Sequence, residues 1–439
     1  MSIAKKGWFK LISLVVVIAL IVSGWMLWNT FDLSRSDAAD DTVKLSDYKT
    51  DDLDAIERGE YVMRVGDCSA CHTAGHGEMA GGYDIATPFG SLYSSNITPD
   101  TETGIGNMTE RDFFNAVRQG IGSHGFLYPA MPYTAYVKYT DQDMHDLWAY
   151  FSTVDPVKND IEETKDMPFP FNVRLSLAGW DMLFFHNEAF SEDVNKDAEW
   201  NRGKYLVDGG GHCSACHSPR NIIGAEIDSR YLHGGNMGDW YAPDLTPNQH
   251  SSISQMTVDE IHEYLKTGSN GIAVASGPMA EAVQHSTQYF TDDDLKSIGH
   301  YLKSLAPSGQ GKSYPKQDVS EQAALEFEVN CSACHGLKGE GITGMVPAFA
   351  NNKTIAAEDA TNLIHAMLKG TRAPYTETRT TAAGMPSFAW KMSDQKIADV
   401  LNYIRNTWDE SGARIITAEE VAEMRSKVEA REKLATPLQ

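Results

Sequence analysis

Apolar residues recur at helical spacing in three stretches of the chain. These stretches are residues 147–151, 298–302 and 400–404. A hydroxyl residue and carboxylates precede each stretch, in 140–143, 291–294 and 393–395, which is the pattern of side chains that cap a helix N-terminus. The sequence therefore predicts three helices, each with an apolar stripe that packs in a core.

Each of these helices closes a longer repeated unit. Residues 57–62 and 200–206 share an Arg-Gly pair followed by Tyr and an apolar residue, and 320–329 is a plainer version of the same opening. Further helices are predicted to begin at Thr109 and at Thr257, which a glutamate follows three residues later as in a capping box. The repetition predicts an all-α chain made of three similar helical units.

Segments rich in helix breakers separate these units. Residues 156–170 and 306–315 are predicted to be linkers. We interpret the charged residues after Thr417 as a solvated helical tail, with binding to a partner subunit as the alternative. The predicted division is an anchor or signal at 1–33, domains at 50–155, 195–306 and 319–410, linkers at 156–194 and 307–318, and the tail at 411–439.

The N-terminus combines positive charge with a long apolar run. Three lysines precede the apolar residues 11–27, which Trp8 and Trp28 flank. About 20 residues at roughly 1.5 Å each span a hydrocarbon core of about 30 Å. We predict a retained transmembrane helix in the cytoplasmic membrane, with the lysines inside and the rest of the chain on the periplasmic side. The alternative is a signal peptide cleaved near residues 36–38.

Overall composition excludes some classes of partner. Lys and Arg number 37 against 60 Asp and Glu, so the net charge of the 439 residues is −23. Because no basic surface is available to neutralise phosphates, nucleic acid is not an expected partner. A hydrophobic content of 42% is sufficient for folded cores, so the chain is expected to be globular.

All six cysteines belong to one motif, Cys-Ser-Ala-Cys-His, which occurs three times. Its members are Cys68, Cys71 and His72; Cys213, Cys216 and His217; and Cys331, Cys334 and His335. Two thiols at this spacing can add to the vinyl groups of a haem, and the histidine that follows can bind the iron. The motif therefore predicts three covalently bound haems c, one in each unit.

Two other uses of a cysteine pair are considered. A redox disulfide does not require the adjoining histidine, and a zinc site needs four ligands that converge from two pairs. Three copies of the motif that include every cysteine favour haem attachment over both alternatives.

The sixth iron ligand is expected to be a methionine, because a soft thioether opposite imidazole raises the reduction potential. Met131, Met279 and Met385 lie 59, 62 and 50 residues after the three motif histidines, each beside Pro or Gly and ahead of the closing helix. We predict that these three are the ligands, in rigid turns. The rival candidates are Met108, Met256 and Met345.

Each motif histidine is expected to donate its second ring nitrogen to a backbone carbonyl, which would fix the orientation of the ring. Pro88, Pro219 and Pro347 are the candidate neighbours for this role, although ordinary loop prolines would look the same. The other histidines are interpreted as surface residues or as polar groups satisfied within the fold.

With these motifs in place, the chain resembles a known family. The phrases at residues 96–100 and 128–133, and the stretch from Met279 through 286–289, are similar to those of the triheme cytochrome c subunit of membrane-bound dehydrogenases from acetic acid bacteria and their relatives. The resemblance covers about residues 50 to 410. It implies three tandem cytochrome c class I domains with His/Met ligation, here His72 with Met131, His217 with Met279, and His335 with Met385.

The resemblance also implies partners. In that family the subunit accompanies a catalytic subunit of flavin, quinone or molybdopterin type, sometimes with a small subunit, that oxidises alcohols, aldehydes or sugar acids. Electrons pass to ubiquinone in the cytoplasmic membrane. Alcohol and gluconate subunits generally have a cleaved signal peptide, so a retained anchor favours an aldehyde-type or otherwise distinct complex.

No motif in the chain predicts substrate chemistry of its own. A Rossmann glycine fingerprint, a nucleophile elbow and a Walker loop are all absent from the sequence. We therefore expect an electron relay without a substrate-oxidising site. The alternatives are a periplasmic haem peroxidase, which needs an open iron position, and an electron-delivery subunit of a terminal oxidase.

Overall fold

The computed structural model describes residues 30–435, except 310, 311, 313, 351 and 409–411, together with four isolated positions nearer the N-terminus. Contacts divide the chain into two compact units, Met1–Met63 with Cys71–Ser191 and Arg64–Ala70 with Glu192–Gln439. The predicted anchor at 1–33 lies almost wholly outside the described residues. Among those that are described, no helix has the length and apolar character needed to cross a bilayer.

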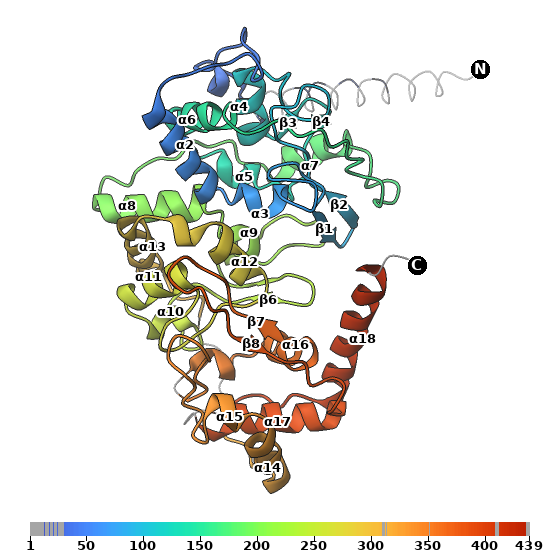
Figure 1. Cartoon of the computed structure of the whole chain (residues 1–439), viewed down its shortest axis with the longest axis vertical. Coiled ribbons are helices and arrows are strands. Elements are labelled where there is room, and N and C mark those ends of the chain that lie inside the picture. The colour runs from blue at the N-terminus through green and yellow to red at the C-terminus, as the bar shows by residue number, and fades with distance from the viewer. Residues whose placement is uncertain are drawn as a thin grey trace, which may run out of the picture. The chain divides into compact units, whose positions relative to one another are not determined.

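Short helices joined by long loops make up the part of the chain before Glu192 (Figure 1). The helices are η1 (Leu33–Ser36), α2 (Leu53–Val65), α3 (Cys68–His72), α4 (Glu110–Gln119), α5 (Tyr133–Tyr136), α6 (Asp141–Phe151) and α7 (Ser176–Phe184). Two antiparallel hairpins pair β1 (Asp84–Thr87) with β2 (Gly90–Tyr93) and β3 (Ile121–Gly122) with β4 (Gly125–Phe126).

The remainder of the chain repeats this organisation with more helices. Its first group is α8 (Ala198–Tyr205), η2 (Leu206–Gly210), α9 (Ser214–His217), η3 (Asp228–Arg230), β5 (Gly235–Asn236), β6 (Tyr241–Ala242), α10 (Ser252–Gln255), α11 (Val258–Thr267), α12 (Pro278–His285), η4 (Thr287–Tyr289) and α13 (Asp292–Ser304). The second group is α14 (Glu321–Asn330), α15 (Ser332–His335), η5 (Lys353–Ala356), α16 (Thr361–Lys369), β7 (Thr371–Arg372), β8 (Gly384–Met385), α17 (Asp394–Thr407) and α18 (Ala418–Ala435).

The predicted helical character is confirmed, but the prediction of an all-α chain missed the four small sheets that the described residues form. Each contains two antiparallel strands, and three of them are only two residues long on each side. Strands this short lie within the loops between helices and have too few residues to show an alternating pattern.

The predicted helix starts are confirmed by their caps. Thr109, Thr140 and Thr257 each accept a hydrogen bond from the backbone N–H three residues later, and the acidic side chain there accepts one from the backbone N–H of the cap residue. Thr291 and Ser393 cap α13 and α17 through the same side-chain bond. These bonds satisfy N–H groups that the first turn of a helix leaves without partners.

The opening and closing helices cross at a glycine in two of the helical groups. A Cβ on Gly59 would lie 1.9 Å from the carbonyl oxygen of Asp146 on α6, and one on Gly203 would lie 2.0 Å from that of Ser297 on α13. Beside the second crossing, Arg202 donates two bonds of 2.7 Å to Asp294. The Arg-Gly pair in the sequence thus marks a close helix–helix contact.

Gly203→Ala is expected to lower the free energy of unfolding by about 1–3 kcal/mol, because the added methyl group overlaps a backbone atom that cannot move alone. Urea denaturation of the full chain measures the change. Gly271→Ala is the matched control, since a Cβ there meets nothing within 4 Å. Equal effects of the two substitutions would show that the crossing tolerates a side chain.

The C-terminal helix is not the solvated extension that we predicted. Val421, Met424 and Val428 on α18 are buried in the same core as Ile397 and Leu401 of α17. Three apolar residues at helical spacing explain the packing, although the many charges between them dominate the sequence pattern.

The predicted linker after Pro156 is an ordered part of the first unit. We call residues 156–187 the strap. The carbonyl of Val157 accepts a bond of 2.7 Å from the Asn96 side chain, and the carbonyl of Glu163 accepts one of 2.9 Å from the backbone of Tyr93. Farther along, the Tyr133 hydroxyl donates a 2.6 Å bond to Asp181 on α7. The strap therefore folds against the loops of this unit.

Asp181 makes stability depend on pH. Its side chain is fully buried, and burial raises its pKa to about 6 in spite of the bond from Tyr133. An unfolded aspartate loses its proton near pH 4, so the native state is penalised as the pH rises from about 4 to 6. Asp181→Asn is expected to be more stable than wild type by up to about 3 kcal/mol at pH 7, and equally stable near pH 4. Urea unfolding at both pH values tests this, and a pH-independent difference would contradict it.

Candidate haem attachment sites

Each motif histidine bonds to a backbone carbonyl, as predicted, but only one of the three predicted partners is correct. The Nδ1 of His335 lies 3.3 Å from the carbonyl oxygen of Pro347. His72 instead bonds to Ser95 at 2.7 Å, and His217 to Pro243 at 2.6 Å. Pro88 and Pro219 were therefore wrong assignments, because these loops bring a carbonyl more distant in sequence to the ring.

This hydrogen bond selects one tautomer of the imidazole. A carbonyl oxygen only accepts, so Nδ1 carries the proton and Nε2 keeps its lone pair. Burial lowers the pKa of His72, His217 and His335, and the carbonyl bond offsets this in part. All three rings are therefore neutral and held in a fixed orientation, as a histidine ligand to iron would need to be.

Each histidine ends a short helix, α3, α9 or α15. Both cysteines of the first motif lie in α3, whereas Cys213 and Cys331 immediately precede α9 and α15, which contain the second cysteine of their motifs. None of the six forms a disulfide. Burial raises the pKa of Cys213 to about 12 and that of Cys331 to about 11, with the second cysteine of each pair adding to the shift. Redox-active Cys-x-x-Cys motifs have lowered thiol pKa values, so these environments do not resemble them.

The zinc alternative requires ligands that converge. Within the described residues, which include every cysteine and histidine, no group of three or more His, Cys, Asp or Glu side chains is placed to hold a metal ion. The donor set instead consists of two thiols and one oriented imidazole at each motif, which fits covalent haem c.

The three predicted methionine ligands occupy different kinds of local structure. Met131 lies in a turn in which its N–H donates to the Tyr128 carbonyl at 3.0 Å. Met279 is the second residue of α12, and Met385 lies in β8 opposite Thr371, so neither of these is in the rigid turn that we expected. All three are partly buried. Their assignment as iron ligands stays a prediction.

The three rival methionines differ from one another in burial and in hydrogen bonding. Met256 is buried, and its sulfur accepts a 3.5 Å hydrogen bond from the side-chain amide of Asn270. Met345 is exposed. The third rival, Met108, is partly buried, and its carbonyl accepts a bond from Leu45.

In the second unit, aromatic residues that the sequence analysis did not single out lie near two of the predicted site residues. The ring of Phe349 stacks on His335, with centroids 4.3 Å apart and an interplanar angle of 16°. Trp240 lies against Gly277, two residues before Met279, and its ring centroid is 4.2 Å from that of His365 on α16. Proximity to Pro347 could have indicated Phe349, but no local signal indicates the pair of Trp240 and His365.

Two family profiles match the chain. Residues 321–408 match the family described as cytochrome c, and residues 54–151 match the family described as cytochrome c oxidase, cbb3-type, subunit III. These ranges contain the first and third motifs, and the second motif lies between them.

Relatives that align with most of the chain show which family it belongs to. The chain is 38% identical over 394 residues to the gluconate 2-dehydrogenase cytochrome c subunit of Pantoea cypripedii. The aligned residues make up 84% of this chain and 89% of that protein. The chain belongs to the family of dehydrogenase cytochrome c subunits. It is 36% identical over 393 residues to the cytochrome c subunit of alcohol dehydrogenase (quinone) of Gluconobacter oxydans, with 84% and 82% covered.

A third relative is named for a dehydrogenase that acts on another substrate. The fructose dehydrogenase cytochrome subunit of Gluconobacter japonicus is 37% identical over 404 residues, with 85% of this cytochrome c subunit and 83% of that protein covered. Membership of the family confirms the predicted resemblance. It also supports haem c as the group that the oriented histidines and paired thiols of this cytochrome c subunit hold.

Proposed function

We propose that this chain carries three covalently attached haems c and relays electrons from a catalytic dehydrogenase subunit to ubiquinone. The observation that carries the proposal is the recurrence of one local arrangement, a Cys-x-x-Cys-His helix whose histidine bonds a carbonyl, at His72, His217 and His335. Haem c supplies a reversible one-electron iron couple, and three such groups along one chain form a relay.

The chain's own residues set the conditions for that relay. Each imidazole is fixed in its own orientation by the hydrogen bond from Nδ1 to a backbone carbonyl. Burial of the rings keeps them neutral. We assign Met131, Met279 and Met385 as the opposing ligands, because each is partly buried and precedes the closing part of its helical group. A thioether in that position favours the reduced iron and raises its potential.

The proposed partner is a separate catalytic subunit. Relatives named as gluconate, alcohol and fructose dehydrogenase subunits support this, as does the absence of substrate-binding motifs from the sequence. We expect that subunit to contain flavin, a quinone cofactor or molybdopterin, and a small subunit to accompany it. Because three substrate classes occur among relatives of similar identity, the substrate must be found by isolating the complex.

We place the chain in the cytoplasmic membrane, with its haem domains on the periplasmic side. The apolar residues 11–27 and the three lysines before them support a retained anchor in that orientation.

Purification of the membrane complex in mild detergent tests the proposal. We expect a large dehydrogenase subunit to co-elute, and its substrate to reduce the haem absorbance, which added ubiquinone then reoxidises. Co-elution with a copper-haem oxidase instead would assign the chain to a terminal oxidase. Peroxide turnover by the isolated chain would assign it to the peroxidases.

A further inference from the structure

The strap exposes large apolar side chains on the outside of the first unit. Phe169 is 81% exposed, Leu175 75% and Leu183 63%. Phe171 and Val173, between them, are also exposed. Single exposed apolar residues are ordinary on protein surfaces, but five within fifteen positions of one segment are not.

The charged groups of this segment are turned inward. Residues 167–185 contain two charged side chains, Arg174 and Asp181. Arg174 forms an ion pair with Glu163 and donates a 2.9 Å bond to the carbonyl of Phe126, and Asp181 is fully buried against Tyr133. The outer side of the segment is therefore uncharged, on a chain whose net charge is −23.

Helix α7 buries a charged residue and exposes apolar ones, the reverse of the usual pattern in a helix that faces water. Its buried positions are Leu177 and Asp181, four residues apart. Leu175, Gly179 and Leu183 follow each other at the same spacing on another side, and all three are exposed. A helix that faces water normally shows its charged residues there, whereas this one shows none. We call the exposed side chains Phe169, Phe171, Val173, Leu175 and Leu183 the apolar face.

The chain enters the first unit beside the end of the strap. Phe31, four residues after the apolar run 11–27 ends, packs against Phe185, with ring centroids 6.2 Å apart. The side-chain amide of Asn187 donates a 3.0 Å bond to the carbonyl of Thr30. The predicted membrane anchor is thus followed immediately by contacts with the residues that end α7.

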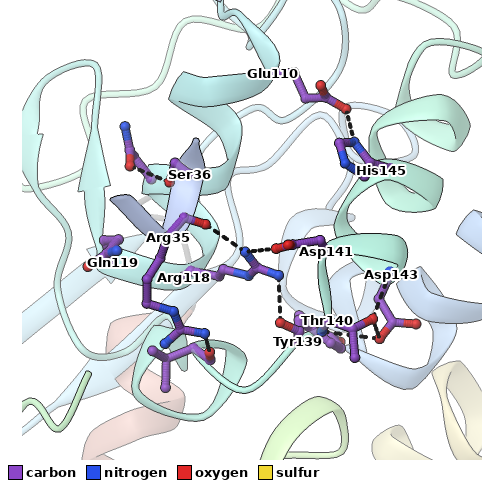
Figure 2. A network of polar contacts seen from close by, with 12 residues as sticks. Arg35, Ser36, Glu110, Arg118, Gln119, Tyr139, Thr140, Asp141, Asp143 and His145 are labelled. Carbon is purple, nitrogen blue, oxygen red and sulfur yellow. Dashed lines mark hydrogen bonds and ion pairs between the residues drawn. The ribbon is translucent and has the colours of Figure 1, made fainter. Parts of the chain in front are cut away.

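A buried network holds this entry point in place (Figure 2). Arg118 is buried and donates bonds to the carbonyl of Arg35 at 3.0 Å and to Asp141 at 2.7 Å. Arg35 donates a 2.7 Å bond to the carbonyl of Val137, and Gln119 donates a 2.8 Å bond to the carbonyl of Asp32. Residues 30–36 therefore belong rigidly to the first unit rather than to a free tether.

We propose that the apolar face lies in the interface of the lipid bilayer, with its side chains below the headgroups. The inference rests on the proposed anchor: a chain that leaves the membrane next to Phe185 brings the end of α7 to the membrane surface. An uncharged apolar surface gains by inserting there, because its side chains leave water for the acyl boundary. Residues 167–185 have no exposed carboxylate, so this segment is not repelled by anionic lipids as an acidic surface would be.

Contact of the apolar face with the bilayer would also determine where the first candidate haem site lies relative to the membrane. The hydroxyl of Tyr128 donates a 2.8 Å bond to the carbonyl of Phe171, and Tyr128 packs with Met167 and Leu177 of the strap. Tyr128 also begins the turn that contains Met131. These contacts join the Met131 turn to the strap, so seating the apolar face in the bilayer would bring this turn close to the membrane surface.

Spin labels on added cysteines test the proposal in the full-length holoprotein. Leu175→Cys and Leu183→Cys place the label on the apolar face, and Leu53→Cys, equally exposed at 75% in the same unit, is the control. The protein is reconstituted in vesicles of phosphatidylethanolamine and phosphatidylglycerol. Collision of the label with oxygen, which concentrates in lipid, is compared with collision with a water-soluble nickel chelate.

We expect the oxygen-to-nickel ratio at positions 175 and 183 to be several-fold higher than at position 53. Equal ratios at the three positions would overturn the proposal. Shielding that appears only after the dehydrogenase subunit is added would also overturn it and would assign the face to a protein partner. Wild type is labelled in parallel: uptake of label by its native cysteines would reveal missing haem attachment, which is a failure of the proposed function and not of the membrane contact.

Discussion

Replacing Cys213 and Cys216 together by serine is expected to reduce the number of covalently bound haems from three to two. The second motif is the informative one, because it lies outside both ranges that match cytochrome c families. Serine hydroxyls do not form thioether links to haem vinyl groups under maturation conditions, so the second haem would have no covalent bond to the chain. Intact mass after acid–acetone extraction, which removes non-covalent haem, counts the groups that remain.

Ser214→Ala is the control for this experiment. It changes the same helix, α9, but keeps both thiols and His217, so the mass of three haems is expected to remain. If wild type already carries two haems, and the double replacement does not alter that number, the second motif does not attach haem and the relay has only two centres.

Local signals in the sequence predicted the elements that carry the motifs. The caps at Thr140 and Thr257 depend on side chains within four residues of each other, so the sequence contains all that is needed to place the start of α6 and α11. The same holds for the Cys-x-x-Cys-His helices. The turn around Met131 could also be predicted from the prolines that flank it.

Partners that are distant in sequence were not predictable in this way. The carbonyls that orient His72 and His217 belong to Ser95 and Pro243, which are 23 and 26 residues away. A carbonyl is present at every residue, so only the path of the loop determines which one reaches the ring. Pro347 was correctly predicted because the third loop is shorter, with the two partners 12 positions apart.

Composition was misleading for the strap and for α18. Prolines between residues 156 and 170 suggested a linker, but proline also suits an extended segment held by side chains such as Asn96. In α18 the charged residues outnumber the apolar ones, yet Val421, Met424 and Val428 are sufficient to bury one side. In both segments the outcome depends on contacts with other parts of the unit.

Met131→Leu, Met279→Leu and Met385→Leu, made singly, are each expected to lower one haem midpoint potential by on the order of 0.1 V or more. Axial ligands set haem potentials over a range of about 0.8 V, and a thioether raises the potential because it favours the reduced iron. Leucine fills a similar volume without a lone pair, so the fold is expected to survive while the iron loses its sixth ligand. Potentiometric titration of the purified chain, followed by its haem spectrum, measures the three couples.

Met256→Leu is the matched control for the second site, because this rival methionine is buried in the same helical group as Met279. Its sulfur accepts a hydrogen bond from Asn270, so its loss is expected to reduce stability without shifting a potential. The reverse pattern, with an altered potential in Met256→Leu and none in Met279→Leu, would transfer the ligand assignment to Met256. Because Met279 belongs to α12 and Met256 follows α10 directly, that result would also place the second haem against a different helix.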